Sequence, residues 1–81
     1  MIFAKSADRA MQKLHKDTQL RIIRKIEFYA SQDAPLDFAE TLSDSRLGAY
    51  RFRVGDMRII FDINRDMIVV LKVGYRKDVY Q

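Results

Sequence analysis

The sequence predicts an α+β fold in which an N-terminal helical hairpin packs on a small, mostly antiparallel β-sheet. Apolar residues recur at helical spacing through the first 32 residues, and apolar and polar residues alternate as in strands from residue 49 onward. Helices followed by strands, with no regular interleaving, are typical of this fold class. At 81 residues the chain has room for one core, so we expect a single domain over 1–81.

The first half predicts a short strand and two helices. Residues 2–4 are apolar and short enough for a first strand, Ser6 is a suitable N-cap for one helix, and Asp17 for a second. The short link between the helices predicts an antiparallel hairpin. Pro35 should end the second helix, because the residue before a proline disfavours helical backbone angles. We expect the acidic stretch 33–45 to be a connection held down by Leu36, Phe38 and Leu42.

The second half predicts three strands, at about 49–54, 57–63 and 67–73. Gly55 and Asp56 form a two-residue turn between the first two. For the second turn, three residues (64–66) would put Val69, Leu71 and Val73 on the apolar face and Lys72 beside Arg58. A two-residue turn would reverse these faces, since one step of register turns every side chain over. The hydrophobic count favours the three-residue turn.

Arg51, Arg53 and Arg58 should share one face of the sheet. The two-residue turn pairs Val54 with Met57 and therefore sets Arg53 opposite Arg58, while the apolar residues of both strands face the helices. Like charges opposite each other destabilise a sheet. The cluster therefore predicts a bound anion, and phosphate in particular, because the planar guanidinium donates two parallel hydrogen bonds and keeps its charge at any physiological pH. We expect this arginine face to stay open to solvent.

Composition narrows the classes of partner. The net charge of +4 arises entirely from residues 46–81, which contain eight Lys or Arg and four Asp or Glu. Such asymmetry is typical of proteins that bind polyanions. The chain has no cysteine, no carboxylates at metal-ligand spacing, and no apolar run of the roughly 20 residues that span a bilayer. We therefore expect no metal, no cofactor, no membrane partner and a cytoplasmic location.

The C-terminal residues suggest a general base. Arg76 and Tyr80 are four residues apart and would share a side of a helical turn. Nearby cations favour phenolate, so they would lower a tyrosine pKa of about 10 toward the range that suits a base. The alternative is a frayed terminus. Tyr75 either packs beside Gly74 or lines the basic face. His15, the only histidine, is interpreted as a solvated residue on a helix surface.

Residues 47–61 (LGAYRFRVGDMRIIF) and 69–80 (VVLKVGYRKDVY) closely resemble the RelE/ParE superfamily of type II toxins, and the length and order of elements agree. The RelE branch cuts messenger RNA in the ribosomal A site by metal-free attack of a ribose 2′-OH on the adjacent phosphate. The resemblance implies that this chain does the same. The catalytic residues that it implies are Arg51, Arg53, Arg58, Arg76 and Tyr80, with RNA and ribosome contacts at Lys72, Tyr75 and Lys77.

The resemblance also implies partners and alternatives. The partners are a cognate antitoxin, messenger RNA and the ribosome (the 30S A site and its RNA), with operator DNA bound only through the antitoxin complex. The superfamily often has lysine where this chain has strand arginines, and many close relatives have histidine in place of Tyr75, so either Tyr75 or Tyr80 could be the base. ParE-like members poison DNA gyrase on the same scaffold and usually lack the C-terminal arginine and tyrosine. A non-catalytic basic binding module is the remaining alternative.

Overall fold

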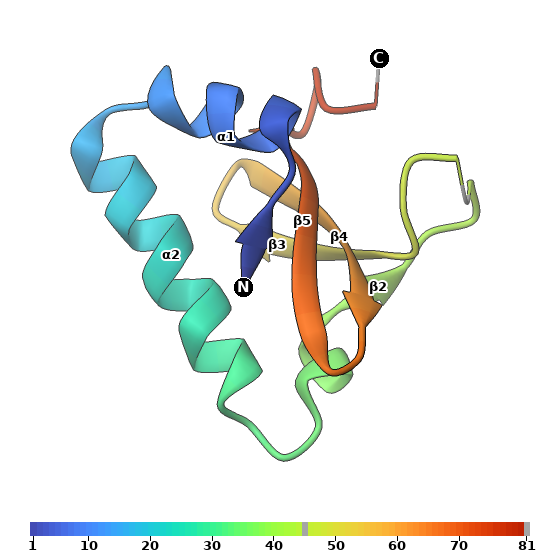
Figure 1. Ribbon diagram of the computed structural model, residues 1–81. Helices are drawn as coiled ribbons and strands as arrows, with labels where there is room; N and C mark the ends of the chain where they lie inside the picture. Colours follow the sequence, from blue (N-terminus) through green and yellow to red (C-terminus); the bar gives the residue numbers. More distant parts are fainter. Residues whose placement is uncertain (45, 81) are drawn as a thin grey trace.

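A computed structural model describes residues 1–44 and 46–80. Its elements follow in the order β1 (Ile2–Phe3), α1 (Lys5–Gln12), α2 (Lys16–Ala30), the 3₁₀ helix η1 (Pro35–Phe38), β2 (Glu40–Thr41), β3 (Tyr50–Val54), β4 (Met57–Asn64) and β5 (Met67–Tyr75). The strands form one sheet in the order β1-β5-β4-β3-β2, with α1 and α2 on one of its faces (Figure 1). β1 runs parallel to β5 and the other pairs are antiparallel. The predicted α+β class is confirmed.

The helices begin and end at residues other than those predicted. Ala4 and His15 occupy the N-cap positions, so Ser6 and Asp17 lie inside the first turns. The Ser6 hydroxyl instead donates a hydrogen bond to the carbonyl of Leu71, at 3.2 Å, and ties α1 to β5. α2 ends at Ala30 and Pro35 starts η1, because proline is well suited to the first turn of a helix. The two helices form an open V, since α1 packs on β5 and β1 whereas α2 packs on β3 and η1 (Figure 1).

The core lies between the helices and the face of the sheet that they cover, which we call the first face. Phe52 and Phe61 are fully buried and stack with ring centroids 4.2 Å apart, and Tyr29 from α2 packs on Phe52 at 4.7 Å. Ile59 is also fully buried, whereas Arg53 is exposed. The predicted register of β3 and β4 is therefore confirmed. Burial of side chains of this size contributes about 1.5–3 kcal/mol each, which is why the apolar face determines the register.

The β4–β5 connection differs from the prediction. Asn64 pairs with Met67 across a two-residue turn, and Arg65 and Asp66 have φ angles of 51° and 65°, as in a type I′ turn. Ile68 and Val70 therefore face the core, and the assignment of Val69 and Leu71 to it was wrong. A β-bulge then leaves Leu71 without a cross-strand partner, because Phe61 pairs with Val70 and Ile60 with Lys72. The extra residue returns Val73 to the core, as predicted.

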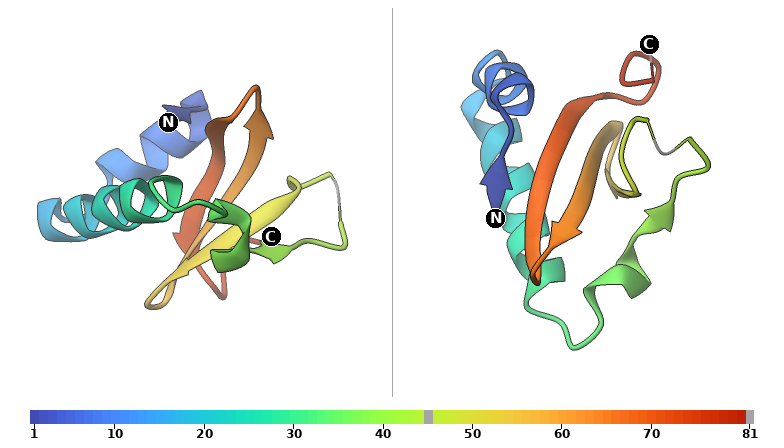
Figure 2. Two further views of the ribbon diagram at one scale, coloured as in Figure 1. Left: turned by 90° about the horizontal axis from the view of Figure 1, so that it is seen from below. Right: turned by 45° about the vertical axis from the view of Figure 1, so that its right-hand side comes forward.

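The second face, which carries the arginines, is partly covered rather than open as predicted. Ile60 and Val79 are buried on it. Residues 46–49, before β3, and the C-terminal residues to 80 lie on this side of the sheet (Figure 2, right). Gly48 allows this loop to approach the sheet: its φ is +147°, and a Cβ there would lie 2.6 Å from Cγ2 of Ile60. On this face Val79 packs against Gly74. The arginines lie beside a second, smaller apolar cluster.

Candidate functional site

Glu40 and Arg51 are direct partners across the β2–β3 pair, which places their side chains on the same face of the sheet. Arg51 Nη2 donates a hydrogen bond to Glu40 Oε2 at 2.6 Å. Arg53 donates a hydrogen bond from Nη2 to Oε2 at 3.2 Å, and its Nε forms an ion pair with Oε1. The carboxylate thus lies between two guanidinium groups, and the hydrogen bond from Arg51, with the charges of both arginines, lowers the pKa of Glu40 below its ordinary value of 4.5.

Sequence analysis missed Glu40. It assigned this residue to an acidic connection, because a two-residue strand is too short to show the alternation that predicts longer ones. The acidic residues of 33–45 stand out in a basic chain, but their pattern does not predict that Glu40 pairs with a strand.

Tyr80 reaches the same arginine from the C-terminus. Arg51 Nη1 donates a hydrogen bond to the Tyr80 hydroxyl, and its guanidinium carbon lies 5.6 Å from the centre of the ring. The hydrogen bond with Tyr80, and to a smaller extent the one with Glu40, raises the pKa of Arg51. The Val79 backbone N–H bonds to the carbonyl of Tyr75 at 2.9 Å, which closes the turn that brings Tyr80 back over the sheet. A phenol close to a guanidinium was predicted, and in the structure that guanidinium belongs to Arg51.

Arg58 lies opposite Arg53, as predicted, but it does not extend its guanidinium beside the others. It is only 8% exposed, and its Nη1 donates to the carbonyls of Gly55 at 2.8 Å and Met57 at 2.9 Å. Arg58 therefore secures the β3–β4 turn. Each of the two opposed cations has a partner within the chain: Arg53 pairs with Glu40, and Arg58 donates to turn carbonyls. The repulsion between them therefore does not by itself require an external anion.

The other predicted contact residues are distributed over both faces. Lys72 lies opposite Ile60, on the same face as Arg51. Tyr75 lies opposite Met57 and so belongs to the face that the helices cover. Arg76 is exposed at the hairpin end, where its backbone N–H donates to the Asp56 carbonyl at 2.9 Å. A shallow hollow there is lined by Asp56, Tyr75, Arg76 and Lys77.

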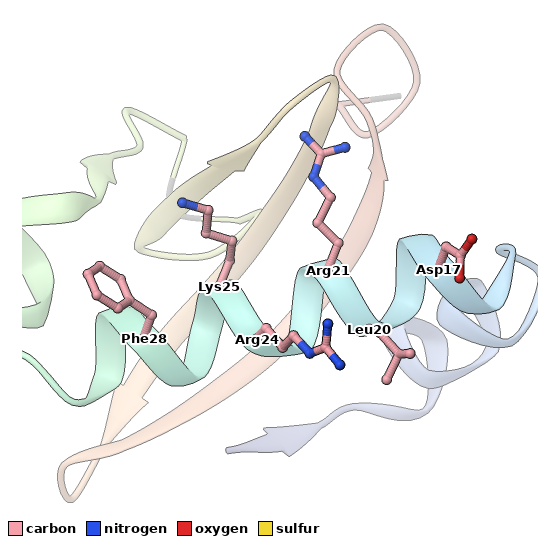
Figure 3. Close-up of a pocket in the computed structure, with 6 residues that line it drawn as sticks. All are labelled: Asp17, Leu20, Arg21, Arg24, Lys25 and Phe28. Carbon is pink, nitrogen blue, oxygen red and sulfur yellow. The ribbon is translucent and has the colours of Figure 1, made fainter.

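A second charged hollow lies on α2, away from the arginine face (Figure 3). Arg21 extends from it toward the β3–β4 turn, where a Cβ at Gly55 would collide with its guanidinium. Lys25 lies 5.7 Å from the ring of Tyr29 and 5.9 Å from that of Phe28. These contacts give Arg21 and Lys25 packing roles. The hollow is lined by Asp17, Leu20, Arg21, Arg24, Lys25 and Phe28.

Among residues 1–44 and 46–80, no three His, Asp or Glu side chains are placed to hold a metal ion. Within the same residues, neither helix is long and apolar enough to cross a membrane.

The sequence model of one toxin family, described as "ParE toxin of type II toxin-antitoxin system, parDE", matches residues 1–80. The chain belongs to this family. The predicted membership of the RelE/ParE superfamily is therefore confirmed, and the protein is a type II toxin.

One solved structure supports the same superfamily for this ParE-family toxin. The structure of the RelB-RelE antitoxin-toxin complex from Methanococcus jannaschii contains a chain that is 26% identical, with a TM-score of 0.69 over 99% of this toxin and 95% of that chain. No curated protein matches the toxin's sequence. The family match and this structural likeness refer to different branches of the superfamily.

Proposed function

We propose that this toxin is a ribosome-dependent endoribonuclease that cleaves messenger RNA in the 30S A site. The observation that supports this best is the placement of the Tyr80 hydroxyl on Arg51, next to Arg53, on the partly open face of the sheet. A phenol oxygen and guanidinium donors in one place provide a proton acceptor and charge stabilisation for phosphate chemistry.

The proposed reaction needs no external nucleophile. The ribose 2′-oxygen bonds to the adjacent phosphorus, the bond from phosphorus to the 5′-oxygen breaks, and the products end in a 2′,3′-cyclic phosphate and a 5′-hydroxyl. Tyr80, as phenolate, accepts the 2′-OH proton, and the departing 5′-oxygen takes a proton from solvent. Arg51 stabilises the phenolate oxygen by donating to it, and in this proposal its guanidinium also donates to the phosphate.

The remaining residues have distinct proposed roles. Arg53, whose side chain is 60% exposed, contacts the non-bridging phosphate oxygens, and Arg76 neutralises charge that develops on the leaving oxygen. Lys72 and Lys77 contact RNA of the message or the ribosome. We assign Arg58 to holding the hairpin that carries Arg53, since its Nη1 bonds to the turn. Tyr75 faces away from Arg51 and is proposed only as a ribosome contact.

The proposed protein partner is an antitoxin. RelE from Methanococcus jannaschii is in complex with the antitoxin RelB, and type II toxins are defined by such pairs. We propose that an antitoxin masks the face that carries Arg51 and Arg53, and that operator DNA is bound only through that complex. Action on messenger RNA and ribosomes places the toxin in the cytoplasm.

A ParE-like DNA gyrase poison is the second candidate, because the matching family model is that of ParE toxins. Primer extension on a reporter messenger after toxin induction separates the two. Discrete cuts within codons are expected for the ribosomal nuclease. Intact message together with gyrase-dependent DNA cleavage would instead establish the second candidate. Replacing the ribose at the cut position with deoxyribose should abolish cleavage, since the nucleophile is then missing.

A further inference from the structure

Glu40 contacts both Arg51 and Arg53, yet it has no part in the proposed chemistry. We propose that its carboxylate competes with RNA phosphate: it holds Arg51 and Arg53 in the resting toxin, and it has to leave Arg53 before a phosphodiester binds. This inference rests on the proposed function in one respect, because it takes the arginine pair as the phosphate site.

The contacts of Glu40 are those that a phosphate would make. Its Oε2 accepts hydrogen bonds from both arginines, and its Oε1 forms an ion pair with Nε of Arg53, so Arg53 contacts the carboxylate through two nitrogens. Carboxylate and phosphate present a similar pair of oxygen atoms to the guanidinium fork. An incoming phosphate that binds Arg53 through the same two nitrogens must therefore displace the carboxylate.

The two arginines differ in how easily they can be released. Arg51 has a side chain that is only 20% exposed, and it is held by Tyr80 as well as by Glu40. The side chain of Arg53 is 60% exposed. That of Glu40 is 43% exposed, and Glu40 lies on β2, an edge strand of only two residues. Exposed ion pairs of this kind contribute little to stability, because water screens both charges. The contact that yields is therefore that between Glu40 and Arg53, while Arg51 keeps Tyr80 in place.

This exchange has a consequence for substrate choice. Glu40 cancels one of the two positive charges, so a single phosphate gains little by replacing it. For an RNA that is held in position by many other contacts, as on a ribosome, the same exchange is only a small part of the total binding free energy. We therefore expect the isolated toxin to bind free single strands weakly, with Glu40 as a cause of that weakness.

The test compares Glu40→Gln with Glu27→Gln, a matched substitution of the only other glutamate, which is exposed on α2. The probe is a trinucleotide of deoxythymidine. It carries phosphodiesters but lacks the 2′-OH, so it cannot be cleaved. Its affinity for purified toxin is measured by NMR titration at neutral pH and fixed low salt. Glu40→Gln should bind about 3–10-fold more tightly than the parent, as expected for removing the exposed ion pair that competes with the phosphate for Arg53, and Glu27→Gln should bind as the parent does.

The side-chain Nε–H signal of Arg53 gives a second readout. In the parent it should shift on saturation with the oligonucleotide, as displacement of Glu40 requires, whereas a merely structural role of Glu40 would leave it unmoved by the oligonucleotide. Equal or weaker binding by a folded Glu40→Gln variant overturns the competition while leaving the phosphate site intact. Absence of binding by parent and variant alike overturns the phosphate site as well. If Glu40→Gln does not fold, Glu40→Asp, whose shorter side chain reaches Arg53 less well, should show the same direction of change.

Discussion

Arg51 and Tyr80 are 29 positions apart in sequence, yet the guanidinium of the first donates a hydrogen bond to the hydroxyl of the second. The pairing requires both the β3 register, which turns Arg51 to the second face, and the C-terminal turn, which brings Tyr80 back over that face. Because Val79 is buried beside Tyr80, the position of the phenol is tied to the packing of the second face.

The first prediction concerns Tyr80. Tyr80→Phe keeps the ring but removes the hydroxyl, so single-turnover cleavage on programmed ribosomes should fall by about 10²–10⁴-fold if the phenol is the base. Ribosome binding should hardly change. Tyr75→Phe is the matched control and should cleave within a few-fold of the parent, because Tyr75 faces the other side of the sheet.

Glu40 provides the check on that assignment. Its carboxylate is a weak base because the arginines lower its pKa, so Glu40→Gln should retain cleavage within a few-fold once bound. A variant that binds RNA yet has lost cleavage would identify Glu40 as the proton acceptor instead.

A second prediction separates two arginines that sequence analysis treated alike. Arg58→Ala removes a charged donor from two turn carbonyls and should lower the free energy of unfolding by about 1.5–3 kcal/mol. Arg76→Ala, at an exposed position, should change it by less than about 0.5 kcal/mol while reducing cleavage more than ribosome affinity. Urea denaturation and single-turnover assays measure both. An Arg58→Ala toxin as stable as the parent but inactive would return Arg58 to the phosphate site.

The third prediction concerns acid. A carboxyl whose pKa is lowered on folding stabilises the protein above its unfolded pKa, and that contribution disappears as the pH falls through the folded pKa. For Glu40 the contribution should therefore be complete above about pH 5 and decline below 4.5. The difference in unfolding free energy between the parent and Glu40→Gln should shrink over this range in urea titrations. A difference that is constant down to about pH 3 would show that the ion pairs do not contribute.

The fourth prediction compares two glycines on the second face. Gly48→Ala combines a positive φ with a Cβ 2.6 Å from Ile60, and should cost about 1–3 kcal/mol of stability. Gly74→Ala places its Cβ in ordinary contact with Val79, at 3.5 Å, and should be nearly neutral. Thermal or urea unfolding of both variants tests the proposed packing of the loop on the sheet. Equal effects would mean that this close approach does not matter.

The sequence by itself determined the α+β class, the superfamily and the β3–β4 hairpin. Alternation over five residues and a glycine-containing turn suffice there, because a shift by one residue would expose Phe52 and bury Arg53. Such local patterns also predicted that Tyr80 would lie near a guanidinium. They could not determine which one, since that depends on how the C-terminal turn packs on the sheet.

The tertiary structure decided the rest. A bulge at Leu71 keeps Val73 in the core after a two-residue turn. The periodicity of the sequence does not predict this extra residue. Arg58 is occupied by its own turn, and Glu40 reaches Arg51 and Arg53 through an edge strand of two residues. Each of these depends on contacts between segments that are individually too short or too irregular to carry a pattern. The way in which charged groups pair around Arg51 and Arg53 therefore depends on the folded sheet and not on any single sequence motif.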